Sequence, residues 1–179
     1  TAGGPGAGSL GRSRGYRGLQ RYLKERDFIV FEQRGTLYAE PSLKCPEVDV
    51  AIRQSAIKKL DFESSLKEEA KAAKACRTRL VKEGIDLSSY DSVASAADIE
   101  DLRRVLGYEK LNLFGISYST RLMINFMRDY PDSARSAVLD SVLPPSVNWD
   151  ETGIDGVVRS LNLLFDNCAA DEVCNEKYP

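Results

Sequence analysis

Residues 111–121 read Leu-Asn-Leu-Phe-Gly-Ile-Ser-Tyr-Ser-Thr-Arg, and this stretch decides the fold. The apolar run at 111–114 indicates a short buried strand, and the apolar spacing that follows the serines indicates a helix. Between them, Ser117 stands between two small residues, Gly115 and Ser119. A sharp strand-to-helix turn needs small flanking residues, because strand and helix nearly collide there, and it pushes the central side chain outward. The spacing therefore predicts an exposed Ser117 hydroxyl at the carboxyl edge of a sheet.

The predicted position of Ser117 favours a role as a nucleophile. A side chain at this place lies at the amino end of a helix, where the helix dipole stabilises developing negative charge. The simpler alternative is a turn in which the serine only caps the following helix. The succession of strand, small-residue turn and helix favours the nucleophile over the cap.

Outward from this stretch, expected strands alternate with expected helices. Apolar runs predict strands at 28–31 and 137–139, the first of the buried parallel type. Helical periodicity predicts helices at 47–83, 93–106, 118–130 and 154–168. This alternation predicts an α/β domain with a parallel sheet.

A glycine-rich segment near the amino end supports an acyl-transfer site. Acyl transfer needs backbone N–H groups that point at the oxyanion of the tetrahedral intermediate. Gly3-Gly4-Pro5-Gly6 can present such groups, because no side chain blocks the approach. The N–H of Tyr118, the residue after the candidate nucleophile, would be the second donor.

The same glycines imitate two phosphate-binding motifs. Residues 3–8 have the glycine spacing of a P-loop, but Ser9 and Leu10 stand where a lysine and a serine or threonine are required. Residues 6–11 match the Gly-x-Gly-x-x-Gly fingerprint of dinucleotide sites, and Glu32 could hold a ribose. No strand precedes the loop in the sequence, so a dinucleotide-binding module is only the alternative.

Composition limits the classes of function. The 179 residues are 42% hydrophobic and 29% charged, which is typical of one globular domain. The net charge of -2 gives no electrostatic reason for binding nucleic acid or an anionic membrane surface. No apolar run approaches the ~20 residues of a membrane-spanning helix. The chain has no histidine, so it cannot by itself hold a complete Ser-His-Asp site or a His-ligated zinc.

The four cysteines fall into two local pairs. None of them forms a C-x-x-C motif, which argues against a zinc ribbon or a thioredoxin-type site. In an exported protein we expect the disulfides Cys45–Cys76 and Cys168–Cys174. In a reducing compartment the four residues would instead serve as small apolar side chains.

Five ordered motifs, distributed over essentially the whole chain, give it a family resemblance. They are Gly3–Gly6, Phe31–Thr36, Ala97–Arg103, Leu113–Arg121 and Val138–Pro145. With these motifs the chain resembles the α/β-hydrolase superfamily, in its prolyl iminopeptidase and tripeptidyl aminopeptidase-like branch. The resemblance implies the α/β-hydrolase fold, a parallel sheet with flanking helices that is incomplete in this chain.

The resemblance also implies an activity. It implies a serine hydrolase without cofactor or metal, which acts on peptides, or on small esters, and releases residues from peptide N-termini. Ser117 matches the nucleophile, and Gly4 and Tyr118 match the oxyanion-hole positions. Glu32 and Arg34 match a motif that stabilises a turn beside the site. The family's catalytic aspartate and histidine follow a cap region, so both would lie outside this chain.

The match suggests how the chain is organised. Residues 1–179 would be a partial catalytic domain, with a helical insertion at about 47–90 and the start of a cap region at about 146–179. The strand that leads into the glycine loop would lie in the sheet between 28–31 and 111–114, and it is missing here. We therefore expect a fragment of a longer hydrolase, which alone aggregates or hydrolyses no activated ester.

Three departures from the family pattern keep alternatives open. Ala2 stands where many relatives have histidine, Ser119 stands where the turn usually has glycine, and residues 37–39 lack the usual glycine. An esterase on the same fold and a non-catalytic hydrolase-like binding protein are the alternatives. The expected disulfides and the resemblance together favour a secreted or periplasmic protein over a cytoplasmic one.

Overall fold

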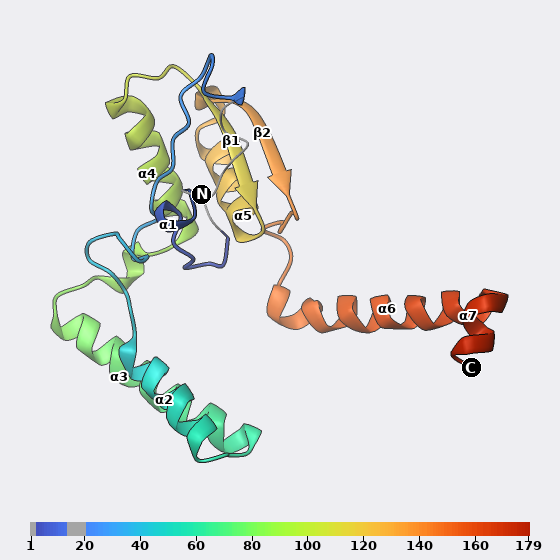
Figure 1. Cartoon of the computed structure of the whole chain (residues 1–179). Helices are drawn as coiled ribbons and strands as arrows, with labels where there is room; N and C mark the ends of the chain where they lie inside the picture. Colours follow the sequence, from blue (N-terminus) through green and yellow to red (C-terminus); the bar gives the residue numbers. More distant parts are fainter. Residues whose placement is uncertain (1–2, 14–20) are drawn as a thin grey trace. The chain divides into compact units, whose positions relative to one another are not determined.

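The sheet that carries the candidate site has two parallel strands, β1 (Leu111–Ile116) and β2 (Ala134–Asp140) (Figure 1). From Asn112 opposite Ser136, the strands stay in register to their carboxyl ends. The crossover between them runs through helix α5 and the short 3-10 helix η3. The strands predicted in these two places are confirmed, and each is longer than predicted.

The computed structural model describes residues 3–13 and 21–179. The chain divides into two compact units, Thr1–Leu143 and Pro144–Pro179. Within the first unit, strands and helices alternate as the sequence predicts, so the α/β class is confirmed. Its helical elements are α1 (Leu10–Ser13), α2 (Pro46–Ile57), α3 (Phe62–Lys82), η2 (Leu87–Ser89), α4 (Ser92–Val105), α5 (Tyr118–Asp129) and η3 (Pro131–Ser133).

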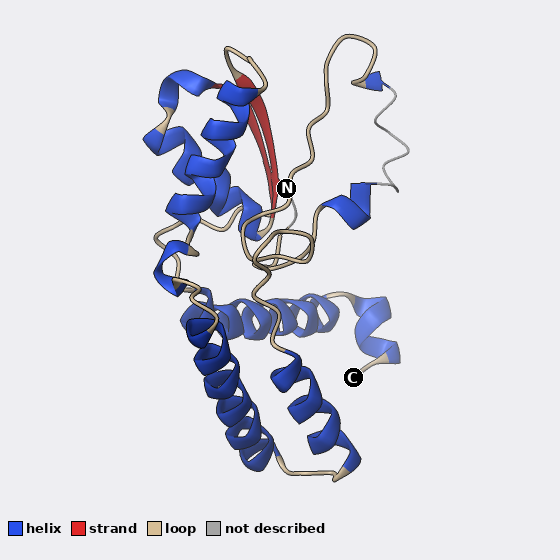
Figure 2. Ribbon diagram, turned by 90° about the vertical axis from the view of Figure 1, so that its left-hand side faces the viewer, coloured by secondary structure: helices blue, strands red, loops and turns tan. Residues whose placement is uncertain are grey.

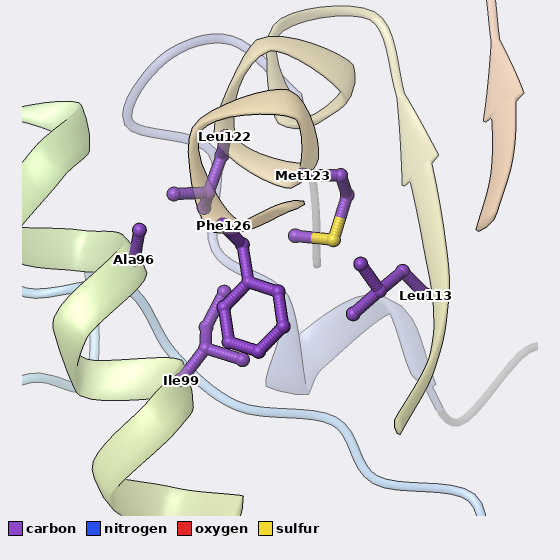
Figure 3. Close-up of a cluster of buried hydrophobic side chains, with 6 residues drawn as sticks. All are labelled: Ala96, Ile99, Leu113, Leu122, Met123 and Phe126. Carbon is purple, nitrogen blue, oxygen red and sulfur yellow. The ribbon is translucent and has the colours of Figure 1, made fainter. Parts of the chain in front are cut away.

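A hydrophobic core lies between the sheet and two of these helices (Figure 3). Helix α5 covers one face of the sheet, and α4 packs against α5. The buried side chains are Ala96, Ile99, Leu113, Leu122, Met123 and Phe126. Burial of each large apolar side chain contributes about 1.5–3 kcal/mol, so this cluster fixes α5, and with it the turn that precedes α5, against β1.

The opposite face of the sheet is open in the described part of the chain. Phe114 and Val138 are opposite each other on β1 and β2, and they are 42% and 57% exposed. Parallel sheets are normally covered on both faces. The face that carries Phe114 and Val138 therefore has the apolar character of a surface that other polypeptide covers.

The prediction of a strand at 28–31 is wrong. These residues are a loop, and Phe28 and Ile29 are each 37% exposed, although Phe31 packs against the core. A strand exists only where a neighbouring strand accepts and donates its backbone hydrogen bonds. Among the described residues no strand lies beside 28–31, so the apolar run has no ladder to join.

A buried carboxylate stabilises the second half of α4. The Glu100 side chain is only 4% exposed, and it accepts hydrogen bonds from Arg103 at 2.7 and 2.8 Å and from Arg104 at 2.8 Å. Arg103 also donates to the carbonyl of Tyr108, which follows the helix. Hydrogen bonds from Arg103 lower the pKa of Glu100 to about 2; desolvation opposes this, and Ser133 and Arg104 add to it.

The Glu100 cluster predicts a pH-dependent stability. Because the pKa is about 2 when folded and 4.5 ordinarily, the stabilisation is complete above pH 4.5 and is lost as the pH falls towards 2. Glu100→Gln should lower the free energy of unfolding by about 2 kcal/mol at pH 7. Denaturation of both proteins across the acid range should show this difference shrinking below pH 4.5.

A matched control uses an exposed glutamate. Glu63 pairs with Lys67 on α3 with 81% of its side chain exposed, so Glu63→Gln should change stability by less than about 0.5 kcal/mol. A Glu100→Gln effect that stays constant from pH 7 to pH 3 would contradict the assignment of a depressed pKa to this carboxylate.

Helices α2 and α3 form a hairpin that is closed by the disulfide Cys45–Cys76 (Figure 2). The sulfur atoms are consumed in this bond, so neither is free to bind a metal ion with the neighbouring Glu47. Arg79 on α3 donates to Glu47 at 2.7 Å and to the carbonyl of Lys44 at 2.8 Å. The hairpin is thus joined at its open end by a covalent bond and an ion pair.

The second unit consists of α6 (Trp149–Ala170) and α7 (Glu172–Lys177). The disulfide Cys168–Cys174 joins the two helices, as the sequence predicts. Helix α6 extends the helix predicted at 154–168, and its apolar side chains, which include Ile154, Val157 and Phe165, are exposed. No helix in the described residues is long and apolar enough to cross a membrane.

The disulfides are expected to differ in their effect on stability. A cross-link that closes 31 residues restricts the unfolded chain more than one that closes 6 residues. Replacing Cys45 and Cys76 by serine should lower the free energy of unfolding by about 3.5 kcal/mol, and replacing Cys168 and Cys174 by about 2 kcal/mol. Urea denaturation measures both values, and a larger loss for the shorter loop would contradict this order.

Candidate active site

Ser117 occupies the turn between β1 and α5 in a backbone conformation that non-glycine residues rarely adopt. Its φ is 57° and its ψ is −125°, and the residue is exposed. The Ser117 N–H donates to the carbonyl of Asp140 on β2 at 2.9 Å. Its carbonyl accepts from the Thr120 N–H at 2.9 Å and from the Thr120 hydroxyl at 2.7 Å. Sheet and helix therefore hold both backbone groups of the strained residue.

Gly115 allows the strand and helix to approach closely enough for this turn. A Cβ atom at position 115 would lie 2.8 Å from the Ser119 carbonyl oxygen and 3.0 Å from Met123 Cγ. Ser119, where a second glycine is usual, is fully buried, and its hydroxyl bonds to the backbone of Ile116 at 2.7 and 2.9 Å. The larger residue is accommodated with its polar atom satisfied.

The glycine segment lies directly against Ser117. A Cβ atom on Gly3 would be 3.0 Å from Ser117 Cβ, 3.5 Å from Ser117 Oγ and 2.9 Å from the Ile116 carbonyl oxygen. Gly4 has a φ of +124°, which only glycine adopts readily. Two segments more than 100 residues apart in the sequence are thus brought together. Ala2 lies outside the described residues.

Tyr118 borders a cavity beside the turn. Its side-chain hydroxyl lies 2.8 Å from the Ser92 hydroxyl at the start of α4. The cavity has a volume of about 360 Å³, and its lining includes Pro5, Gly6, Arg34, Leu43, Tyr90 and Tyr118. A space of this size, next to both the glycine segment and the residue after Ser117, is large enough for an amino-acid side chain.

Glu32 holds the glycine segment in place. Its carboxylate accepts from the N–H groups of Ser9 at 2.8 Å and Leu10 at 3.0 Å, and from the Thr36 hydroxyl at 3.0 Å. Desolvation raises the pKa of Glu32, but hydrogen bonds from Leu10, Ser9, Thr36 and Tyr38 together lower it below its usual value. A carboxylate that serves these donors is not free to bind a ribose, which removes the main support for a dinucleotide site.

Arg34 connects the same turn to helix α4. Its guanidinium donates to both carboxylate oxygens of Asp98 at 2.7 and 2.6 Å and to the carbonyl of Ser89 at 2.6 Å. Glu32 and Arg34 therefore anchor different segments: Glu32 holds the glycine segment, and Arg34 holds η2 and the middle of α4.

Two contacts of the site were not found from the sequence. Thr120 is fully buried and also accepts from the N–H of Leu143 at 2.8 Å, so it links Ser117 to the chain after β2. A threonine in the first turn of a helix can bond to the carbonyl three residues earlier, and this was the available signal. The contact of Ser92 with Tyr118 had no local signal, because 26 residues separate the two.

Comparisons with known proteins agree with this geometry. A model of the alpha/beta hydrolase fold family matches residues 3–163. Serine protease Hip1 of Mycobacterium tuberculosis is 26% identical over 184 residues, which cover 99% of this chain and 35% of that protein. Tripeptidyl aminopeptidase of Streptomyces lividans is 30% identical over 142 residues, which cover 74% of this chain and 25% of that protein.

The chain thus spans about a third of the length of the first relative and a quarter of the second. The family match covers most of the chain and includes Ser117, the glycine segment and both strands. The parallel sheet, the crossover helix and the strained serine between them agree with that match. The chain therefore belongs to the α/β-hydrolase fold family.

Proposed function

We propose that the protein is a serine peptidase that forms an acyl-enzyme on Ser117. The observation that carries this proposal is the exposed, left-handed Ser117 at a strand-to-helix turn, with the backbone of Gly3 against its side chain. Strained conformations of this kind persist only where the surroundings enforce them, and they are concentrated at functional sites. The similarity of the chain to a serine protease and to a tripeptidyl aminopeptidase adds support.

This chain supplies the nucleophile and the oxyanion donors. Ser117 Oγ attacks the substrate carbonyl, and the N–H groups of Tyr118 and Gly4 stabilise the oxyanion of the tetrahedral intermediate. Tyr118 is the first residue of α5, so its N–H has no partner within the helix and the helix dipole adds to the stabilisation. Collapse of the intermediate releases the amine and leaves the acyl group on Ser117, which water then removes.

The proton transfers need a residue that this chain lacks. A base must take the Ser117 proton and deliver it to the leaving amine, and histidine is the usual group. The sequence has no histidine. We place the histidine, and the acid that orients it, in polypeptide outside residues 1–179, which makes these residues part of a longer hydrolase. Its cap region would begin at about residue 146.

Peptides with a free amino terminus are the proposed substrates. The name of the Streptomyces relative supports this choice. The cavity beside Tyr118 would receive a side chain of the substrate. The disulfides support a secreted or periplasmic location, because such bonds persist in oxidising compartments.

Hydrolysis of a matched substrate set by the complete protein tests the proposal. Tripeptide p-nitroanilides with a free amino terminus should have a kcat/KM at least roughly ten-fold above their N-acetylated counterparts, because an unpaired recognition group costs binding. Equal cleavage of both forms would overturn the aminopeptidase assignment. Turnover of p-nitrophenyl esters without any peptide cleavage would instead favour an esterase.

A further inference from the structure

Ser119 makes an unusual connection across the turn at Ser117. It is the second residue of α5, it is fully buried, and its hydroxyl reaches back to the last residue of β1. The hydroxyl accepts from the Ile116 N–H at 2.7 Å and donates to the Ile116 carbonyl at 2.9 Å. One side chain therefore binds both backbone polar groups of the residue that precedes Ser117.

These two groups of Ile116 have no place in the ladder with β2. In a strand, the N–H groups of successive residues point to opposite edges. The Ser117 N–H points to β2, where it donates to Asp140, so the groups of Ile116 point to the other edge of β1. No strand among the described residues pairs with that edge. Within the described residues, the Ser119 hydroxyl bonds to both of these groups.

The connection bears on the strained residue itself. A non-glycine residue with a φ of 57° is strained, and the surrounding structure must constrain it on both sides. On the helix side, Thr120 binds the Ser117 carbonyl. On the strand side, the Ser119 hydroxyl fixes Ile116, and thereby the peptide group that leads into Ser117. A glycine at position 119 would provide neither of these hydrogen bonds.

We propose that Ser119 is a positioning residue for acyl transfer, whose hydroxyl holds the turn in the geometry that aims Ser117 Oγ at the substrate carbonyl. This inference rests on the proposed function of Ser117. On this proposal, the serine that replaces the usual glycine at position 119 supports activity. Removal of its hydroxyl should lower kcat and leave substrate binding unchanged.

Ser119→Ala in the complete protein tests the inference, because it removes the hydroxyl and keeps the Cβ atom. We expect kcat for a peptide p-nitroanilide to fall about ten-fold, with KM within two-fold, since small errors in reacting geometry are costly. Titration of active sites with a fluorophosphonate should show an unchanged number of sites that react about ten-fold more slowly. The kcat of Ser119→Cys should lie between those of the unmodified protein and Ser119→Ala, because a thiol forms weaker hydrogen bonds than a hydroxyl.

Ser55→Ala is the matched control, because Ser55 is also a buried helical serine but its hydroxyl has no hydrogen-bond partner among the described residues. We expect it to leave kcat and KM unchanged. A Ser119→Ala kcat within two-fold of the unmodified protein, or a loss of active sites with an unchanged kcat per site, would overturn the inference.

A second measurement does not depend on activity. Amide hydrogen exchange at Ile116 should be about ten-fold faster in Ser119→Ala, because the N–H loses its acceptor. Equal exchange rates would also overturn the inference. Failure of the proposed function would give a different result, because Ser117 of the unmodified protein would then not react with the fluorophosphonate. The exchange rate at Ile116 would still show whether the Ser119 hydroxyl holds the turn.

Discussion

Ser117→Ala is expected to lower kcat for peptide hydrolysis by roughly 10⁴-fold or more, with little change in thermal stability. The hydroxyl forms the covalent intermediate, so no neighbouring group can replace it; the oxyanion donors alone leave a small residual rate. The side chain is exposed, so its removal leaves no cavity. Steady-state kinetics and a melting curve of the complete protein measure the two expectations.

Ser141→Ala is the matched control for this variant. Ser141 is also exposed, it also has a φ of 57°, and it follows the neighbouring strand β2. Loss of a hydroxyl from a strained, exposed serine is therefore common to both variants. Ser141→Ala should keep kcat within about two-fold of the unmodified protein. If kcat fell as far in Ser141→Ala as in Ser117→Ala, the loss of activity in Ser117→Ala would not show that Ser117 is a nucleophile.

Gly115→Ala is expected to be strongly damaging to both stability and activity. The new Cβ would lie 2.8 Å from the Ser119 carbonyl oxygen and 3.0 Å from the carbonyl carbon of the same residue. Because these are backbone atoms of a packed helix, α5 must shift away from β1. We expect a loss of about 3 kcal/mol in the free energy of unfolding and a large loss of activity.

The control for this prediction is Gly156→Ala, which adds the same methyl group to a glycine inside helix α6. A Cβ atom at Gly156 meets nothing within 4 Å, and alanine favours a helix by about 1 kcal/mol over glycine. This variant should be as stable as the unmodified protein or slightly more stable. Denaturation and kinetics of Gly115→Ala measure these expectations. If the variant kept the stability and kcat of the unmodified protein, the close approach of β1 and α5 would not explain the glycine at position 115.

Much of the fold could be predicted because its signals are local. The apolar run at 111–114 and the helical spacing after it are separated by the small residues of the turn, and both the strand and the helix are present in the structure. The run at 28–31 is equally apolar, yet it forms no strand. Its conformation depends on whether a partner strand lies beside it, which the run itself does not encode.

The site divides in the same way between local and distant causes. The small residues around Ser117 are adjacent in sequence, so the spacing alone predicted a tight turn. Ser9 and Leu10 lie 23 and 22 residues from Glu32, and Ser89 and Asp98 lie 55 and 64 residues from Arg34. Only the folded chain shows that these segments are the ones Glu32 and Arg34 anchor. The hydrogen bonds of Ser119 to Ile116 were not predicted, because the family pattern asks only for a small residue at position 119.

The central claim is that Ser117 is the reacting nucleophile, and covalent labelling tests it most directly. The complete protein is treated with a fluorophosphonate and digested with trypsin, which releases residues 111–121 as one peptide. Because this peptide also contains Ser119 and Thr120, fragment ions must locate the label. We expect a label on Ser117 that disappears in Ser117→Ala. A label on Ser119 or on another serine, or no label at all, would contradict it.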